Sequence, residues 1–146
     1  MNDGKHDPEI AVRDAVAADV RALHDFLRPF VLAREILPRN EAELETLVAH
    51  GFVATRQGQI VGFAAVVIYS AKMAEVQALA VAPEARGSGL GTRLVKKCVE
   101  RAKEQGVIEL MAITATEELF RTVGFDYALP NQKRALFLQT REVEHE

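Results

Sequence analysis

A glycine-rich segment in the middle of the chain is the part of the sequence best suited to binding a ligand. It consists of Arg86-Gly87-Ser88-Gly89-Leu90-Gly91-Thr92 and stands between an expected strand and a long expected helix. Glycine lets the backbone adopt positive φ and approach a bound group closely. The first amides of the following helix have no partner inside it, and the helix dipole adds partial positive charge there. The segment therefore predicts a cradle for an anion such as a phosphate.

The spacing of these glycines excludes two well-known nucleotide motifs. A dinucleotide fingerprint that starts at Gly87 needs glycine at its sixth position, where Thr92 stands. The acidic residue that this fingerprint needs about 20 positions further on is also missing, since Val107 occupies that place. A P-loop needs Gly-Lys-Ser/Thr at its end, whereas this chain has Gly91-Thr92-Arg93. A different phosphate-bearing ligand is expected.

Composition limits the class of protein. The 146 residues suit one domain spanning 1–146, with a flexible start at 1–8 and a solvated acidic tail at 141–146. Because 21 Asp and Glu outnumber 18 Lys and Arg, a nucleic-acid partner is not expected. No secretion signal and no apolar run long enough for a bilayer is visible, so we expect a cytoplasmic protein that does not associate with membranes.

Cysteine and histidine give no sign of a metal site. The single cysteine, Cys98, falls in an apolar helical row with Leu94 and Ala102, which indicates a core thiol. The four histidines show no metal-ligand spacing, so we expect no metal.

Hydrophobic periodicity and turn residues predict the elements that position the glycine-rich segment. Pro29 is expected to kink or end the first helix, and Asn40 with Glu43 is a helix-start signature. Strands are expected at 10–13, 52–56, 60–69, 75–81 and 107–113, after a turn at Gly124-Phe125, and at 135–140. Helices are expected around 20–31, from 40 to 48, at 89–105 and at 116–122. This order predicts an α/β fold with a mostly antiparallel sheet and one parallel crossover through the helix at 89–105.

The pattern Arg86-x-x-Gly89-x-Gly91, after a strand that ends Leu79-Ala80-Val81 and Pro83, resembles the acetyl-CoA motif of the GNAT N-acetyltransferase superfamily. The preceding hairpin, the strand at 107–113 and Gly124-Phe125 extend the resemblance over nearly the whole chain. It implies a GNAT-like mixed, mostly antiparallel sheet of about six to seven strands flanked by about four helices, with a V-shaped gap between the fourth and fifth strands.

Within this superfamily the chain is most similar to the acetyltransferase domain of bacterial N-acetylglutamate synthases, which begin arginine biosynthesis. The similar residues are Ile36-Leu37-Pro38-Arg39, Glu75 at the head of the motif strand, and Leu129-Pro130 followed by Lys133-Arg134. No amino-acid-kinase-like domain precedes the motif, so a short stand-alone form is expected, without arginine inhibition through that domain.

The resemblance implies acetyl-CoA as co-substrate. It assigns the pyrophosphate to the amides of Arg86, Gly87, Ser88, Gly89, Leu90 and Gly91, with the Thr92 hydroxyl. Main-chain groups of Leu79 and Val81 would pair with the pantetheine arm as an added strand does. An amide near Leu79 or Ala80 would polarise the thioester carbonyl.

Direct acetyl transfer to an amine, with both substrates bound together, needs a base, because a free amino acid is largely ammonium at pH 7. By resemblance and by chemistry Glu75 is the candidate, acting through a water; the alternative is a solvent-exposed carboxylate at a strand end. The general acid stays open between Thr114, Tyr127 and a water.

The resemblance makes L-glutamate the favoured acceptor. Its two carboxylates call for cations, arginine above all, and Arg39 matches a family position. Lys133, Arg134 or Arg141 would supply a second cation, although the chain departs from the family at Gln139-Thr140-Arg141-Glu142. The alternatives are another small amine, a protein amino terminus, or a non-catalytic acyl-CoA-binding regulatory module. A homodimer through terminal strands, common among relatives, is also left open.

Overall fold

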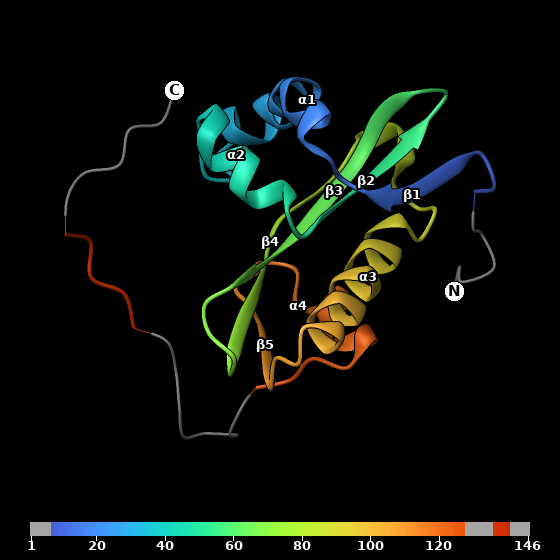
Figure 1. Ribbon diagram of the computed structural model, residues 1–146. Helices are drawn as coiled ribbons and strands as arrows, with labels where there is room; N and C mark the ends of the chain where they lie inside the picture. The colour runs from blue at the N-terminus through green and yellow to red at the C-terminus, as the bar shows by residue number, and fades with distance from the viewer. Residues whose placement is uncertain (1–6, 128–135, 141–146) are drawn as a thin grey trace.

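One five-stranded sheet organises the part of the chain that the structure, a computed structural model, describes: residues 7–127 and 136–140. Its strands lie side by side in chain order, and the helices pack against the faces of the sheet (Figure 1). The strands are β1 (Ile10–Asp14), β2 (Gly51–Arg56), β3 (Gln59–Ile68), β4 (Met73–Val81) and β5 (Glu109–Ala112). The helices are α1 (Val20–Leu32), α2 (Glu41–Val48), α3 (Leu90–Glu104) and α4 (Glu117–Val123), with 3₁₀ turns η1 (Ala17–Asp19) and η2 (Pro83–Ala85).

The direction of the strands confirms the expected mixed sheet. Strands β1 to β4 pair antiparallel with their neighbours, and β4 pairs parallel with β5. Parallel neighbours need a long crossover, which α3 supplies. The expected hairpin is present as β2 and β3, joined at Gln57 and Gly58.

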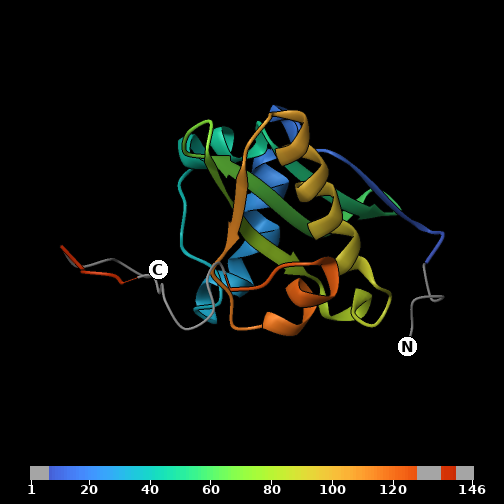
Figure 2. The ribbon, with the colours of Figure 1, turned by 90° about the horizontal axis from the view of Figure 1, so that it is seen from below.

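Helices cover both faces of the sheet. Figures 1 and 2 show α1 and α2 on one face, and α3 with α4 on the other. On the first face Leu23 and Leu44 belong to a buried cluster with Phe63; on the second, Leu94 and Cys98 lie in another. Each helix presents an apolar stripe to the sheet, which is what its sequence periodicity predicts.

The beginning of α2 follows the sequence signal, whereas Pro29 does not end its helix. The amide of Glu43 donates to Asn40 Oδ1 (2.8 Å), and the Asn40 amide donates back to Glu43 Oε1 (2.9 Å). Helix α1 continues past Pro29 to Leu32, and the Ala33 amide donates to the Pro29 carbonyl (3.0 Å). A proline in the last turn removes one hydrogen bond there without ending the helix.

Strand β4 contains an irregularity that the sequence did not predict. Phe63 pairs with Ala80 and Ala65 with Gln77, so two residues of β4 face one of β3 between them. Ala78 has φ 59°, a left-handed conformation that is uncommon for alanine. These features define a β-bulge at Ala78.

Strands β4 and β5 pair over only half of β4. Their register runs from Met73–Glu109 to Val76–Ala112. Beyond Val76, the β5 side of β4 has no strand partner in the described part of the chain. The strands therefore part where the V-shaped gap was expected.

The expected last strand at 135–140 is wrong for the residues described there, Leu136 to Thr140. These residues form no strand, and Leu136, Phe137 and Leu138 are 92%, 75% and 86% exposed. A strand needs a hydrogen-bonding neighbour, and the described sheet includes none for this segment. Residues 125–127, the described beginning of the strand expected after the Gly124-Phe125 turn, form no strand either. The described sheet thus has five strands rather than six to seven. The expectations for residues 1–6 and 141–146 lie outside the described residues.

Candidate active site

The turn between β4 and α3 presents a row of backbone N–H groups without acceptors. Gly87 and Gly89 have φ 83° and 78°, and Gly89 is the N-cap of α3. Within the described residues, no backbone or side-chain acceptor receives the amides of residues 87–92. A Cβ built on either glycine would meet nothing within 4 Å, so the turn is open, and the first turn of α3 carries no acidic residue. This row suits an anion.

Two residues of the glycine-rich segment have contacts of a different kind. The Ser88 hydroxyl donates to the Ala85 carbonyl (2.6 Å), so this side chain is already engaged. Gly91 lies inside α3, and a Cβ there would come within 2.8 Å of Leu119 Cδ1. The missing side chain of Gly91 therefore lets α3 and α4 approach each other.

The free edge of β4 directs main-chain groups out of the sheet. The amide of Ala82 donates to the Val61 carbonyl (2.8 Å), so Ala82, and by alternation Ala80, face β3. Leu79 and Val81 therefore direct their amides and carbonyls the other way, toward the side that β5 leaves open. The Arg86 side chain reaches the same edge, with Nε donating to the Val81 carbonyl (3.3 Å).

Four polar side chains meet beside this edge, and we call them the Glu75 cluster: Arg39, Tyr69, Glu75 and Gln77. The Tyr69 hydroxyl donates to Glu75 Oε1 (2.5 Å). Gln77 Nε2 donates to the same oxygen and to the Tyr69 hydroxyl, both at 3.0 Å. Arg39 Nη2 donates to Gln77 Oε1 (2.8 Å). The structure thus brings together Glu75 and Arg39, which the sequence proposed separately.

Electrostatics differ between the two ends of the Glu75 cluster. Burial lowers the pKa of Arg39, while the charges of Glu43, Glu75 and Tyr69 oppose that shift. The hydrogen bond to Glu75 raises the pKa of Tyr69, with burial adding to it, so the hydroxyl keeps its proton. The guanidinium also donates from Nη1 to the Leu37 carbonyl (3.2 Å).

A cavity of about 390 Å³ lies against Arg39, between α1 and α2. The segment before α2 forms one wall of it. His24 and Arg28 of α1 line it together with Arg39 and Glu43. This lining makes the cavity suitable for a small anion.

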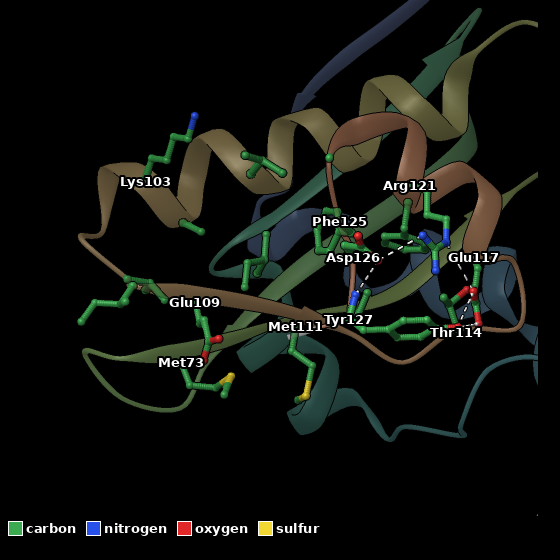
Figure 3. Close-up of a pocket in the computed structure, with 18 residues that line it drawn as sticks. Met73, Lys103, Glu109, Met111, Thr114, Glu117, Arg121, Phe125, Asp126 and Tyr127 are labelled. Atoms are coloured by element: carbon green, nitrogen blue, oxygen red, sulfur yellow. Dashed lines mark hydrogen bonds and ion pairs between the residues drawn. The ribbon is translucent and has the colours of Figure 1, made fainter. Parts of the chain in front are cut away.

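The two candidate acids lie elsewhere. Thr114 and Tyr127 line a cavity of about 600 Å³ between β5, α3 and α4, shown in Figure 3. The Tyr127 hydroxyl donates to both oxygens of Glu117 (3.1 and 3.2 Å), and Thr114 Oγ1 accepts from the Thr116 amide (2.8 Å). None of the described hydrogen bonds joins either residue to the Glu75 cluster. This cavity is the larger one, but the base and the open amides are not part of its lining.

Sequence reasoning missed Tyr69, Gln77 and the bulge at Ala78. Gln77 could have been predicted from the sequence, because alternation along a strand places residues 75 and 77 on one face. Predicting the place of Tyr69 requires the register of β3 on β4, which the sequence does not contain. In that pairing the Tyr69 amide donates to the Met73 carbonyl (2.9 Å). Lys133, Arg134 and Arg141, the candidate second cations, lie outside the described residues.

The chain belongs to the acetyltransferase (GNAT) family, whose model matches residues 18–125. It is therefore an N-acetyltransferase by family, with the mixed α/β fold described above. An uncharacterised N-acetyltransferase of Chlorobaculum tepidum is 31% identical over 117 residues, which cover 80% of this chain and 76% of that protein.

Two further relatives bear on the acceptor. The amino-acid acetyltransferase of Pasteurella multocida is 33% identical over 129 residues, 84% of this chain and 29% of that protein. The structure of N-acetylglutamate synthase from Neisseria gonorrhoeae, complexed with coenzyme A and N-acetyl-glutamate, superposes with a TM-score of 0.75 at 26% identity, over 87% of this chain and 30% of that one. The chain thus spans about three tenths of these longer proteins.

The described residues include neither a helix that could cross a membrane nor a group of metal ligands. No helix there is both long and apolar enough to cross a membrane. Nor do three or more His, Cys, Asp or Glu side chains gather there as a metal site would need.

Proposed function

We propose that this chain transfers an acetyl group from acetyl-CoA to the α-amino group of a small amino acid, with L-glutamate as favoured acceptor. The observation that carries the proposal is the Glu75 cluster, which holds a carboxylate and a guanidinium in one network beside the free edge of β4. The amino-acid acetyltransferase relatives support the choice of an amino acid.

The coenzyme would be held mainly by the backbone. The unpaired amides of residues 87–92 would bind its pyrophosphate, and Leu79 and Val81 would pair with the pantetheine arm along the free edge of β4. Acetyl-CoA supplies the acetyl group as a thioester that an amine can attack. Of the two candidate oxyanion donors, the amide of Leu79 is favoured, because Ala80 faces β3.

The acceptor would be held from both ends. Arg39 would bind a carboxylate, since its guanidinium has five N–H donors and its two hydrogen bonds occupy only two of them. Glu75 would take a proton from the ammonium group through a water, which leaves the amine neutral for attack. Thr114 and Tyr127 are bonded to other groups, so a water is favoured as the acid for the departing thiolate.

The test measures thiol release from acetyl-CoA with glutamate, glutamine and a polyamine as acceptors. With glutamate, Glu75→Gln should lower kcat by roughly 10²- to 10⁴-fold, the usual contribution of a general base. Arg39→Ala should raise the acceptor KM about tenfold or more, because one charge-assisted hydrogen bond is lost. If the rise is larger for glutamate than for glutamine, Arg39 binds the side-chain carboxylate.

Matched controls are Glu45→Gln and Arg21→Ala, at exposed positions of α2 and α1. Neither should change the kinetics. Activity only with polyamines or peptide amino termini would contradict the amino-acid acceptor. Coenzyme binding without turnover would favour a non-catalytic acyl-CoA-binding module. A cytoplasmic location and a homodimer stay predictions.

A further inference from the structure

The carboxylate of Glu75 is held by only one of its two oxygens. Oε1 accepts hydrogen bonds from the Tyr69 hydroxyl (2.5 Å) and from Gln77 Nε2 (3.0 Å). Oε2 has no hydrogen-bond partner in the described part of the chain. Two donors occupy the lone pairs of Oε1, so Oε2 is the oxygen left to accept from a water.

Gln77 joins this carboxylate to Arg39 with a fixed orientation. Its Oε1 accepts from Arg39 Nη2 (2.8 Å), and its Nε2 donates to Glu75 and to the Tyr69 hydroxyl. A flipped amide would set its NH₂ group against the guanidinium and its oxygen against the carboxylate. Both contacts would then be repulsive, so the charges at the two ends determine the amide orientation.

The four side chains come from three separate parts of the fold. Glu75 and Gln77 share one face of β4 by alternation. Tyr69 follows the end of β3, and Arg39 precedes α2. Because the network crosses these elements, it fixes the guanidinium relative to the base.

We propose that Tyr69 and Gln77 are positioning residues for the acetyl transfer, and that the acceptor's proton arrives at Glu75 Oε2. This inference rests on the proposed function. A proton passes from the ammonium nitrogen to a water, and the water passes one to Oε2, so the nitrogen regains its lone pair. Gln77 meanwhile sets the distance between Arg39 and Oε2. The site therefore favours acceptors that carry both an amine and a carboxylate.

The first test is Tyr69→Phe. The hydroxyl contacts Glu75 and Gln77 but not Arg39, so kcat should fall about tenfold while the acceptor KM stays within about twofold. Tyr69 is 55% exposed, so losing its hydroxyl leaves no buried gap. The matched control is Ser70→Ala, whose hydroxyl accepts from the Lys72 amide in the same turn. This control should match the wild type.

The second test is Gln77→Leu. Leucine has a similar volume but removes both the acceptor for Arg39 and the donor to Glu75. It should lower kcat and also raise the acceptor KM, both by about tenfold. In an Arg39→Ala background the KM effect should vanish, because Gln77 acts on acceptor binding through Arg39. A purely structural role would instead lower the melting temperature and leave the KM effect in both backgrounds.

The outcomes separate this inference from the proposed function. If the wild type turns over, Glu75→Gln does not, and Tyr69→Phe equals the wild type, then the positioning role is wrong. A KM effect of Gln77→Leu that persists without Arg39 also overturns it. If the wild type acetylates no amine, or Glu75→Gln keeps full activity, then the proposed function itself fails. If Gln77→Leu does not fold, the kinetics of Tyr69→Phe alone test the positioning role.

Discussion

Cys98 is an unreactive thiol because of its surroundings. Its side chain is 0% exposed, between α3 and the sheet. Burial raises the pKa of Cys98 to about 12 from 9.0, with the charge of Arg101 opposing the shift. Since the thiolate is the nucleophile, the native chain should react very little at this position.

We therefore expect iodoacetamide at pH 8 to label Cys98 roughly a thousandfold more slowly in the native chain than in denaturant, because three pKa units separate the two thiols. Mass spectrometry of the quenched samples measures this rate. The same shift predicts that stability is unaffected below pH 9 and falls as pH rises from 9 toward 12, since only the unfolded thiol ionises there. Equal labelling of both states would contradict the burial.

Residue types alone did not point to the tyrosine that contacts Glu75. Tyr127 was a reasonable candidate from its type and place, but its hydroxyl is bonded to Glu117. The type and place of Tyr69 in the sequence do not indicate a site residue, yet its hydroxyl contacts the predicted base. Both assignments depend on contacts between segments distant along the chain, which one sequence does not contain.

The link between β1 and α1 depends on Asp19. Arg13 Nη1 and Nη2 donate to its two carboxylate oxygens (2.9 Å each), and the Val16 amide donates to Oδ2 (2.8 Å). The hydrogen bonds from Arg13 are the main cause that lowers the pKa of Asp19, against a smaller opposing effect of burial. The ionised carboxylate of Asp19 thus holds the segment between β1 and α1 in place through these hydrogen bonds.

We expect Asp19→Asn to lower the free energy of unfolding by about 1 kcal/mol at pH 7, as loss of a capping carboxylate does. Because the folded pKa is depressed, the contribution is present above the ordinary value of 3.8 and is lost as pH falls through the folded value. Urea unfolding at pH 7 and below pH 3.8 measures the difference. Asp25→Asn, exposed on α1, is the control; an equal loss at both pH values would contradict the prediction.

At the scale of elements, local signals predicted most of the fold. The capping box at Asn40, the amphipathic pattern of α3 and the hairpin are encoded within a few residues, and all are present. The bulge at Ala78 is not, because it depends on how β4 meets β3. The end of β4–β5 pairing could be expected only through the family resemblance.

For the whole molecule, coenzyme binding should appear as stabilisation of the native state. A ligand at about 100 times its Kd stabilises by about 2.7 kcal/mol, so coenzyme A should raise the melting temperature in a concentration-dependent manner. Gly89→Ala should weaken this response, because φ 78° is unfavourable for alanine and the amides must shift. Differential scanning fluorimetry measures both effects.

The chain offers a close control for that experiment. Gly58, in the β2–β3 turn, has φ 79° and equally open surroundings, so Gly58→Ala carries the same backbone strain away from the amides. It should lower the melting temperature and keep the full response to coenzyme A. An undiminished response in Gly89→Ala would show that these amides do not hold the ligand.

The bulge in β4 also limits how this strand can change in length. Before it, Ala74 and Val76 belong to the α3-side cluster; after it, Ala80 belongs to the cluster under α1 and α2, and Leu79 and Val81 pack toward α3. The side chains of β4 thus alternate between the two faces in one phase before the bulge and in the opposite phase after it, with one inserted residue between the two halves. Deleting the extra residue at Ala78 would leave the side chains of both halves on their present faces, whereas a deletion elsewhere in β4 would turn the side chains on one side of it to the opposite face.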